Sequence, residues 1–144
     1  MFSKTCKYGI RAIIFIASES VINKKMSQKE IANQIDSPMA FTAKILQKLV
    51  HKNIVSSSKG SGGGFYIEKN RLNKITLLEI IEALDCDSII KGCGLGLRDC
   101  SEEHPCPFHD KFRIIKSNLL NVFRNTTLEE LASGIKKGSA FLKY

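Results

Sequence analysis

The sequence of 144 residues lacks any hydrophobic run long enough to cross a membrane. A transmembrane helix needs roughly 20 apolar residues, whereas the most apolar stretch, residues 10–17, is shorter and contains Arg11. The first residues also lack the layout of a secretory signal peptide. The cysteines number five, which is odd, so a closed framework of disulfides is not expected. These absences predict a cytoplasmic protein, in a reducing environment, with no membrane partner.

The sequence also lacks the motifs of an enzyme. It has no Cys-x-x-Cys pair, and no nucleophile and base lie at a spacing that indicates a catalytic pair. The glycine-rich run at 59–64 does not end in Gly-Lys-Ser/Thr and precedes a predicted strand, so it is not a phosphate-binding loop. We therefore expect no enzymatic activity.

Acidic residues are scarce in the first half of the chain. Residues 1–74 contain 13 Lys/Arg and 4 Asp/Glu, a net charge of +9, whereas residues 75–144 contain 9 and 10, a net charge of −1. A general need for solubility does not explain why one half holds all the positive excess. The asymmetry predicts that residues 1–74 bind a nucleic acid, and we expect double-stranded DNA.

Helical patterns dominate this basic half. Residues 3–20 carry apolar side chains at three- and four-residue steps, which is typical of a helix. Ser27 opens a Ser-x-x-Glu sequence, which predicts a capping box at the start of a second helix. Ser37 and Pro38 predict the N-cap and the first residue of a third helix. Two helices joined by a short turn form a helix-turn-helix.

Two short β-rich runs flank the glycine loop in residues 54–67 and predict a hairpin with a basic tip. Helix, helix and hairpin is the order of a winged helix-turn-helix. The predicted fold class is therefore mainly α with a small β-hairpin. We expect a DNA-binding domain at residues 1–74, followed at 75–144 by a cysteine-rich loop (about 91–108) and a long C-terminal dimerisation helix.

The second helix of a helix-turn-helix enters the major groove with its N-terminal end. We expect the side chains of Thr42, Ala43 and Lys44 to contact base edges, and those of Gln47 and Lys48 to contact phosphates. The start of the preceding helix and the hairpin tip suit phosphates and the adjacent groove. The candidate DNA-binding residues are Ser27, Gln28, Ala40, Thr42, Ala43, Lys44, Gln47, Lys48, Lys59 and Gly60.

Apolar residues recur at steps of four, three, four and three after the cysteine loop, as on one side of a long helix. A narrow stripe of this kind packs either within its own chain or against another chain. In a chain this short we favour a homodimer. The candidate dimerisation residues are Phe108, Phe112, Ile115, Leu119 and Val122.

Three thiols and one imidazole lie close together in the cysteine loop. Such ligands suit a zinc ion or an iron–sulfur cluster, and the spacing alone leaves both open. His109 is preferred to His104, because a step of three residues places His109 and Cys106 on one face of a helical turn. Cys6 and Cys86 are expected to be buried core or spare thiols. The candidate metal ligands are Cys93, Cys100, Cys106 and His109.

With the hairpin and the loop both in view, the chain resembles the IscR/NsrR-like regulators, the Rrf-two family of bacterial transcription factors. The matching segments are Tyr8-Gly9, the hairpin at 55–65, Cys93 to His109, and residues 126–131. The resemblance implies homodimers that bind inverted-repeat operators and respond to iron–sulfur status, nitric oxide or redox stress. In the IscR-like branch three cysteines and one histidine hold a two-iron, two-sulfur cluster, and the candidate ligands here match that set.

The sequence departs from the family pattern at the first gap of the cysteine loop, which is longer by one residue. Lys7 also stands where the nitric-oxide-sensing branch can carry an acidic ligand, and Ala43 stands where IscR-like proteins can carry a glutamate. The resemblance still implies a DNA-binding repressor with a 2Fe-2S cluster, in preference to 4Fe-4S or zinc. The alternative is a winged-helix regulator whose loop holds structural zinc or acts as a cluster-free thiol switch.

Overall fold

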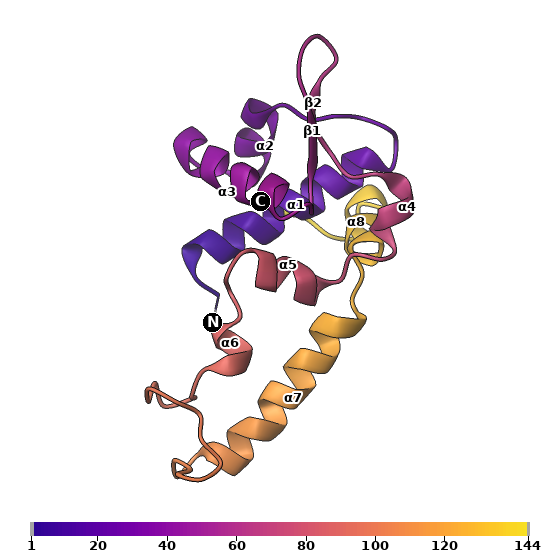
Figure 1. Ribbon diagram of the computed structural model, residues 1–144. Helices are drawn as coiled ribbons and strands as arrows, with labels where there is room; N and C mark the ends of the chain where they lie inside the picture. Colours follow the sequence, from indigo (N-terminus) through magenta and orange to yellow (C-terminus); the bar gives the residue numbers. More distant parts are fainter. Residues whose placement is uncertain (1, 144) are drawn as a thin grey trace.

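The chain folds into helices and one antiparallel hairpin, in a computed structural model that describes residues 2–143 (Figure 1). This is the fold class that the sequence predicts, although the short helices α4 and α6 have no counterpart in the prediction. The elements in chain order are α1 (Lys4–Ser20), α2 (Gln28–Ile35), α3 (Met39–His51), β1 (Ser56–Ser58), β2 (Gly64–Tyr66), α4 (Lys69–Leu72), α5 (Leu77–Ala83), α6 (Ser88–Lys91), α7 (His109–Asn125) and α8 (Leu128–Lys136).

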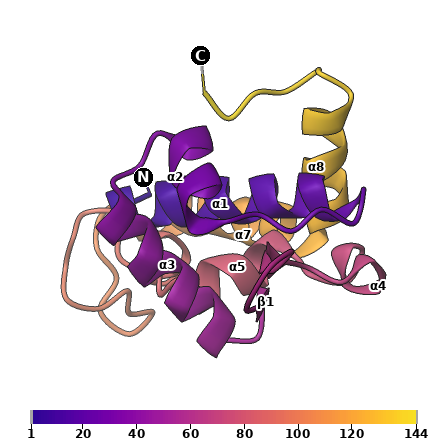
Figure 2. The same cartoon turned by 90° about the horizontal axis from the view of Figure 1, so that it is seen from above.

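Helix α1 lies at the centre of the core and packs against α2, α3 and α8. Figure 2 shows α2 and α3 near the N-terminal part of α1 and α8 at its C-terminal end. Ile13 and Ile16 of α1 are fully buried, and α8 adds Leu128 and Ala132 to the same cluster. The core therefore joins elements from both ends of the chain, which brings α8 back to the N-terminal half.

The capping box predicted at Ser27 is confirmed. The Ser27 hydroxyl accepts from the Glu30 N–H at 3.2 Å, and the Glu30 carboxylate accepts from the Ser27 N–H at 2.8 Å. The next helix begins differently from the prediction: Pro38 is the N-cap of α3, and no side chain caps it. The Ser37 hydroxyl is buried and has no hydrogen-bond partner among the described residues.

The predicted hairpin forms the wing that projects at the top of Figure 1. Ser57 pairs with Phe65 in the centre of the ladder, and Phe65 also exchanges two backbone hydrogen bonds with Met26, of 2.8 and 2.9 Å. Gly64 has φ +139°, and a Cβ at this position would lie 2.8 Å from the Met26 carbonyl oxygen. Only glycine allows this close approach, which fixes the base of the wing against the segment before α2.

Helix α7 extends away from the rest of the molecule in Figure 1 and reaches the cysteine loop at its far end. At its near end the chain is fixed by backbone bonds, from Leu77 N–H to Thr126 carbonyl and from Leu128 N–H to Ile75 carbonyl, both 2.9 Å. Helix α5 begins after its N-cap Thr76, which forms a full capping box with Glu79. The division into domains at 74/75 stays a prediction. Within residues 2–143, no helix is long and apolar enough to span a membrane.

Candidate functional site

The start of α3 exposes most of the residues predicted to contact DNA. Ala40, Lys44 and Gln47 are exposed, and Ala43 is half-buried. Thr42, in contrast, is fully buried, and its hydroxyl donates to the Pro38 carbonyl at 3.1 Å. The prediction that Thr42 contacts bases is therefore wrong, because this residue lies on the inner face of α3 with the buried side chains of the helix.

Lys48 is engaged by its own chain. Its Nζ forms an ion pair with the Asp85 carboxylate at 2.5 Å and donates to the Leu84 carbonyl at 3.3 Å. In the structure this lysine is paired within its own chain, and its contact with phosphate stays a prediction. Lys48, with Lys52 nearby, lowers the pKa of Asp85, which keeps this carboxylate ionised. The sequence could not reveal this contact, because the partners are 37 positions apart.

The remaining predicted contacts lie at the start of α2 and on the wing. The Gln28 side-chain amide donates to the Met39 carbonyl at 3.4 Å, which ties the start of α2 to the start of α3. Lys59 and Gly60 are exposed at the wing tip. The sequence argument missed Lys25, whose ammonium contacts the Ser58 hydroxyl at 3.1 Å and lies 4.7 Å from the centre of the Tyr66 ring. This lysine extends the basic surface to the side of the wing.

The four candidate metal ligands form two pairs. The Sγ atoms of Cys93 and Cys106 are 3.8 Å apart, and Cys100 Sγ lies 3.6 Å from His109 Nδ1. His109 is buried at the start of α7, whereas His104 is exposed on the loop. Among the residues that the structure describes, no three His, Cys, Asp or Glu side chains converge on one point for a metal ion.

The separation within each pair suits two ligands of one tetrahedral metal ion. With a metal–sulfur distance near 2.3 Å, tetrahedral geometry separates two sulfurs by about 3.8 Å. With a metal–nitrogen distance near 2.05 Å, it separates sulfur and nitrogen by about 3.6 Å. Each pair can therefore supply two ligands to one metal ion.

Two further features surround the loop sulfurs with hydrogen-bond donors. The backbone N–H groups of Leu95 and then Leu97 lower the pKa of the Cys93 thiol. Lys116 of α7 donates to Cys100 Sγ and to the Gly92 carbonyl, both at 3.2 Å. The sequence argument missed Lys116. Its position seven residues after His109, on the same face of α7, was the available signal.

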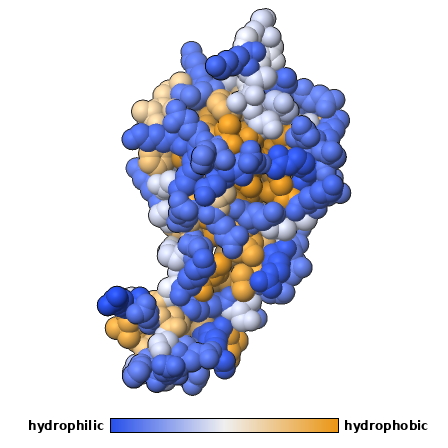
Figure 3. Space-filling view, viewed as in Figure 1, coloured by the Kyte–Doolittle hydropathy of each residue, from blue (hydrophilic) through white to orange (hydrophobic). Residues whose placement is uncertain are grey.

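The stripe predicted for dimerisation is largely open to solvent. Phe108, Ile115 and Val122 have exposed fractions of 37%, 47% and 55%, while Phe112 and Leu119 are half-buried. The prediction missed Ile114, which is 63% exposed. Figure 3 shows apolar atoms at the surface of the lower region, which α6 and α7 occupy in Figure 1.

Comparisons with known proteins agree on one family. The family model named Rrf2, an iron-dependent transcriptional regulator, matches residues 2–134. An HTH-type transcriptional regulator of Aquifex aeolicus is 32% identical over 133 residues, which cover 91% of this chain and 90% of that protein. CymR, the global cysteine regulator of B. subtilis, has a TM-score of 0.72 at 23% identity and covers 92% of this chain and 96% of its own. T. potens IscR has a TM-score of 0.73 at 16% identity, with coverages of 97% and 91%. The two structural matches confirm the winged-helix fold.

Proposed function

The chain belongs to the Rrf2 family of transcriptional regulators, and from this premise we propose that it is a cytoplasmic, homodimeric repressor that senses iron–sulfur, nitric oxide or redox status. Membership of the family makes it a DNA-binding regulator and not an enzyme. The proposal adds the sensing group, the dimer and the operator, and each has its own structural support.

Binding to an inverted-repeat operator is supported by the position of the basic side chains. Ala40, Lys44 and Gln47 on α3 and Lys59 on the wing are exposed on the half of the chain that carries the positive charge. A recognition helix and a wing read one half-site, and a twofold dimer presents two of them to a palindrome.

Homodimerisation is supported by the exposed stripe of α7. A helix that exposes Ile114, Ile115 and Val122 leaves apolar surface in water, and a second copy would cover the same stripe on its partner. Because α7 leads from the cysteine loop to α8, the dimer contact and the proposed sensor share one helix. A change in the loop can therefore alter how the two DNA-binding halves are held.

The observation that carries the proposed sensor is the division of the four ligands into two pairs. In a 2Fe-2S centre we assign Cys93 and Cys106 to one iron, and Cys100 and His109 to the other, on the distances within each pair. A bound cluster would supply a one-electron redox couple whose potential depends on hydrogen bonds to its sulfur ligands. Lys116 would hold Cys100 in place and offset part of the negative charge. A four-iron cluster or a single zinc ion fits these pairs less well.

A small coupling free energy between the cluster site and the DNA-binding surface is enough to regulate operator binding. An allosteric coupling of about 1–3 kcal/mol changes an affinity by roughly 5- to 150-fold. Ordering of residues 91–108 against α7 is a change that can supply such a difference, since Lys116 of α7 already contacts Gly92 and Cys100 of this loop.

The test uses protein purified without oxygen and reconstituted with iron and sulfide. We expect visible charge-transfer absorption, two irons and two sulfides per chain, and a change in affinity for operator DNA selected from a random duplex pool. The variant His109→Ala should lose this absorption, whereas His104→Ala, a matched change on the same loop, should keep it. Zinc in place of iron, or operator binding that responds to oxidants without any metal, would favour the structural-zinc or thiol-switch alternative.

A further inference from the structure

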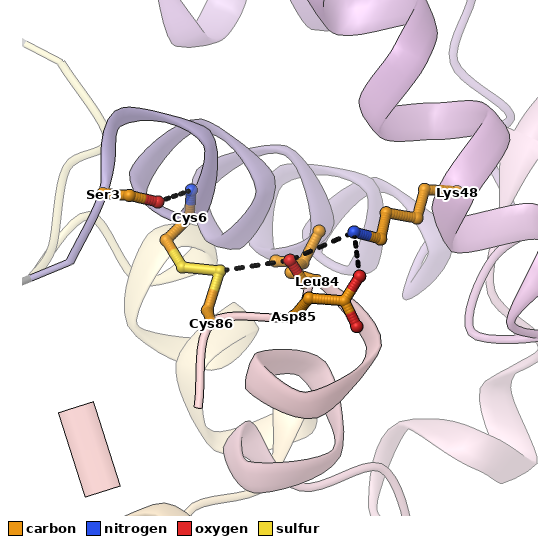
Figure 4. The surroundings of a disulfide bond; sticks show 6 residues. All are labelled: Ser3, Cys6, Lys48, Leu84, Asp85 and Cys86. Carbon is orange, nitrogen blue, oxygen red and sulfur yellow. Dashed lines mark hydrogen bonds and ion pairs between the residues drawn. A yellow bond between two sulfur atoms is a disulfide. The ribbon is translucent and has the colours of Figure 1, made fainter. Parts of the chain in front are cut away.

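Cys6 and Cys86, the two cysteines outside the loop, are bonded to each other. The structure joins them as a disulfide with a Cα–Cα distance of 6.0 Å across 80 positions of sequence. Their exposed fractions are 1% and 6%, so both are buried, as the sequence analysis expected, but the bond between them was not predicted. The bond connects the first turn of α1 to the residue that follows the last turn of α5 (Figure 4).

A disulfide is unusual in a protein that is expected in a reducing compartment. Intracellular disulfides are rare, and those that form are mostly transient and sense the redox state. The Cα–Cα distance lies in the usual range for disulfides, so the pair can close without movement of the backbone. Cys6 lies in the first turn of the 17-residue helix α1, so the disulfide ties the start of this helix to the turn after α5.

The turn that carries Cys86 also holds the recognition helix. α5 ends with Asp85 in the left-handed conformation, at φ +54°, and the Cys86 N–H donates to the Ile81 carbonyl at 2.9 Å. Glycine is the usual residue at such a position. Here an aspartate occupies it, and its carboxylate binds Lys48 of α3. In Figure 4, Lys48 reaches this turn from one side while the two sulfurs meet on the other.

The Leu84 carbonyl connects these two sides. It accepts from Lys48 Nζ at 3.3 Å, and Cys86 Sγ lies 3.4 Å from the same oxygen. In the disulfide this sulfur has no proton to donate. After reduction the Cys86 thiol can donate to Leu84, and the turn loses its covalent link to α1. Both changes alter the turn that holds Lys48.

We propose that Cys6 and Cys86 form a second redox site, a dithiol that hydrogen peroxide converts to the disulfide, and that Asp85 and Leu84 then withdraw Lys48 from operator DNA. One thiolate attacks a peroxide oxygen, which breaks the O–O bond and gives a sulfenic acid and, after protonation, water. The sulfur of the second cysteine attacks the sulfenic sulfur, the S–O bond breaks, and a second water leaves. One peroxide is reduced to two waters while two thiols are oxidised to one disulfide. A small oxidant suits the site because both sulfurs are buried.

This proposal rests on the proposed operator binding. It predicts a change in operator affinity that does not depend on the cysteine loop. Each lysine that neutralises a phosphate adds about 0.9 to the slope of log affinity against log salt. Release of Lys48 in both subunits should therefore steepen the slope by about two, and at 0.15 M salt should raise the affinity by roughly thirty-fold. The reduced protein is the tight binder and the oxidised protein the weak one.

The experiment uses the full chain with Cys93, Cys100 and Cys106 replaced by serine, so that only the proposed pair can react. Operator affinity is measured at several salt concentrations after treatment with dithiothreitol or with hydrogen peroxide, and differential alkylation with mass spectrometry locates the disulfide. We expect a Cys6–Cys86 bond after peroxide, an affinity about thirty-fold lower and a slope smaller by about two. Dithiothreitol should restore both.

Two variants test whether the disulfide acts on DNA binding through Asp85 and Lys48. Asp85→Asn keeps a side chain that tolerates the left-handed turn, so the disulfide should form, yet the oxidised protein should bind DNA nearly as tightly as the reduced one. Lys48→Met should bind weakly in both states. No disulfide after peroxide, an unchanged affinity once it has formed, or an Asp85→Asn variant that still responds fully would each overturn the inference. Failure of the unmodified chain to bind DNA both with and without its reconstituted cluster would overturn the proposed function, so the two failures are distinguishable.

Discussion

Gly9 allows α1 and α5 to approach each other closely. A Cβ at this position would lie 2.6 and 2.7 Å from the two terminal carbons of Leu84, which is itself only 2% exposed. Alanine in a helix is favoured over glycine by about 1 kcal/mol, but overpacking a buried site costs about 1–3 kcal/mol. Gly9→Ala should therefore lower the free energy of unfolding by up to about 2 kcal/mol. Because Leu84 precedes Asp85, the same change should disturb the contact with Lys48.

Gly134 in α8 is the matched control. A Cβ there would approach only the side chains of Ala140, at 3.3 Å, and Ser139, both of which are exposed and can move. Gly134→Ala should stabilise the protein by up to about 1 kcal/mol through helix propensity alone. Urea unfolding of both variants at one protein concentration, followed by circular dichroism, gives the two values, provided that the slope m is unchanged.

A double-mutant cycle with Leu84→Ala isolates the clash. Truncation of Leu84 removes the atoms that the new methyl group would meet, so Gly9→Ala should stabilise that background by up to about 1 kcal/mol through helix propensity. The coupling energy should be about 1–3 kcal/mol, and the double variant should be more stable than the sum of the two single changes predicts. Additive changes in the cycle would refute the assigned packing of α1 on α5.

Three further predictions concern the recognition helix, the dimer and the α2 cap. Thr42→Val should leave operator affinity almost unchanged in a binding titration, because the side chain is buried, whereas Lys44→Ala, at a predicted base contact, should weaken operator binding and relax its sequence preference; a loss of affinity in the valine variant would restore Thr42 as a base contact. Ile115→Glu should produce monomers in sedimentation analysis, while Arg124→Glu, at an exposed site on the opposite side of α7 from Ile115, should not; an intact dimer in both would remove α7 from the interface. The Ser27 N–H, and after it the Ser27 hydroxyl, lowers the pKa of Glu30 in the folded protein. The capping box therefore stabilises the protein fully at pH values above the pKa that Glu30 has in the unfolded chain, about 4. This contribution is lost as the pH falls from there through the lower pKa of the folded state. The variant Glu30→Gln should therefore lose less stability than the unmodified chain in unfolding curves recorded across this acidic range, and equal losses would contradict the assignment.

The elements that the sequence predicted well are those fixed by contacts within a few residues. Ser27 meets a glutamate three positions later, and its predicted capping box forms; Thr76 follows the same local pattern with Glu79. The wing is likewise set by its glycines and by the β-rich runs that flank them. A local pattern suffices in these places because the partners lie within one turn of the chain.

One error could have been avoided from the local pattern: Thr42 lies three and four positions before the buried Ile45 and Leu46, so it shares their inner face of α3. Other contacts were invisible because a distant part of the chain decides them. Lys48 looked free because its partner, Asp85, belongs to another helix end. The bond between Cys6 and Cys86 was equally invisible, because the two residues are 80 positions apart and an odd number of cysteines does not indicate which two of them pair.

Residues 84–86 are the point at which both proposed sulfur sites meet the DNA-binding half. Cys86 is bonded to α1, Asp85 binds Lys48 of α3, and the chain continues from here through α6 into the cysteine loop. Movement of that loop can therefore reach this turn along the backbone, as well as α7 through Lys116. Asp85 adopts the left-handed conformation, which aspartate tolerates, and its carboxylate adds the contact with Lys48 that a glycine could not make. A turn held by the disulfide would also limit how far movement of the cysteine loop reaches α3. Oxidation of Cys6 and Cys86 should therefore reduce the change in operator affinity that the loop causes, instead of adding an independent change.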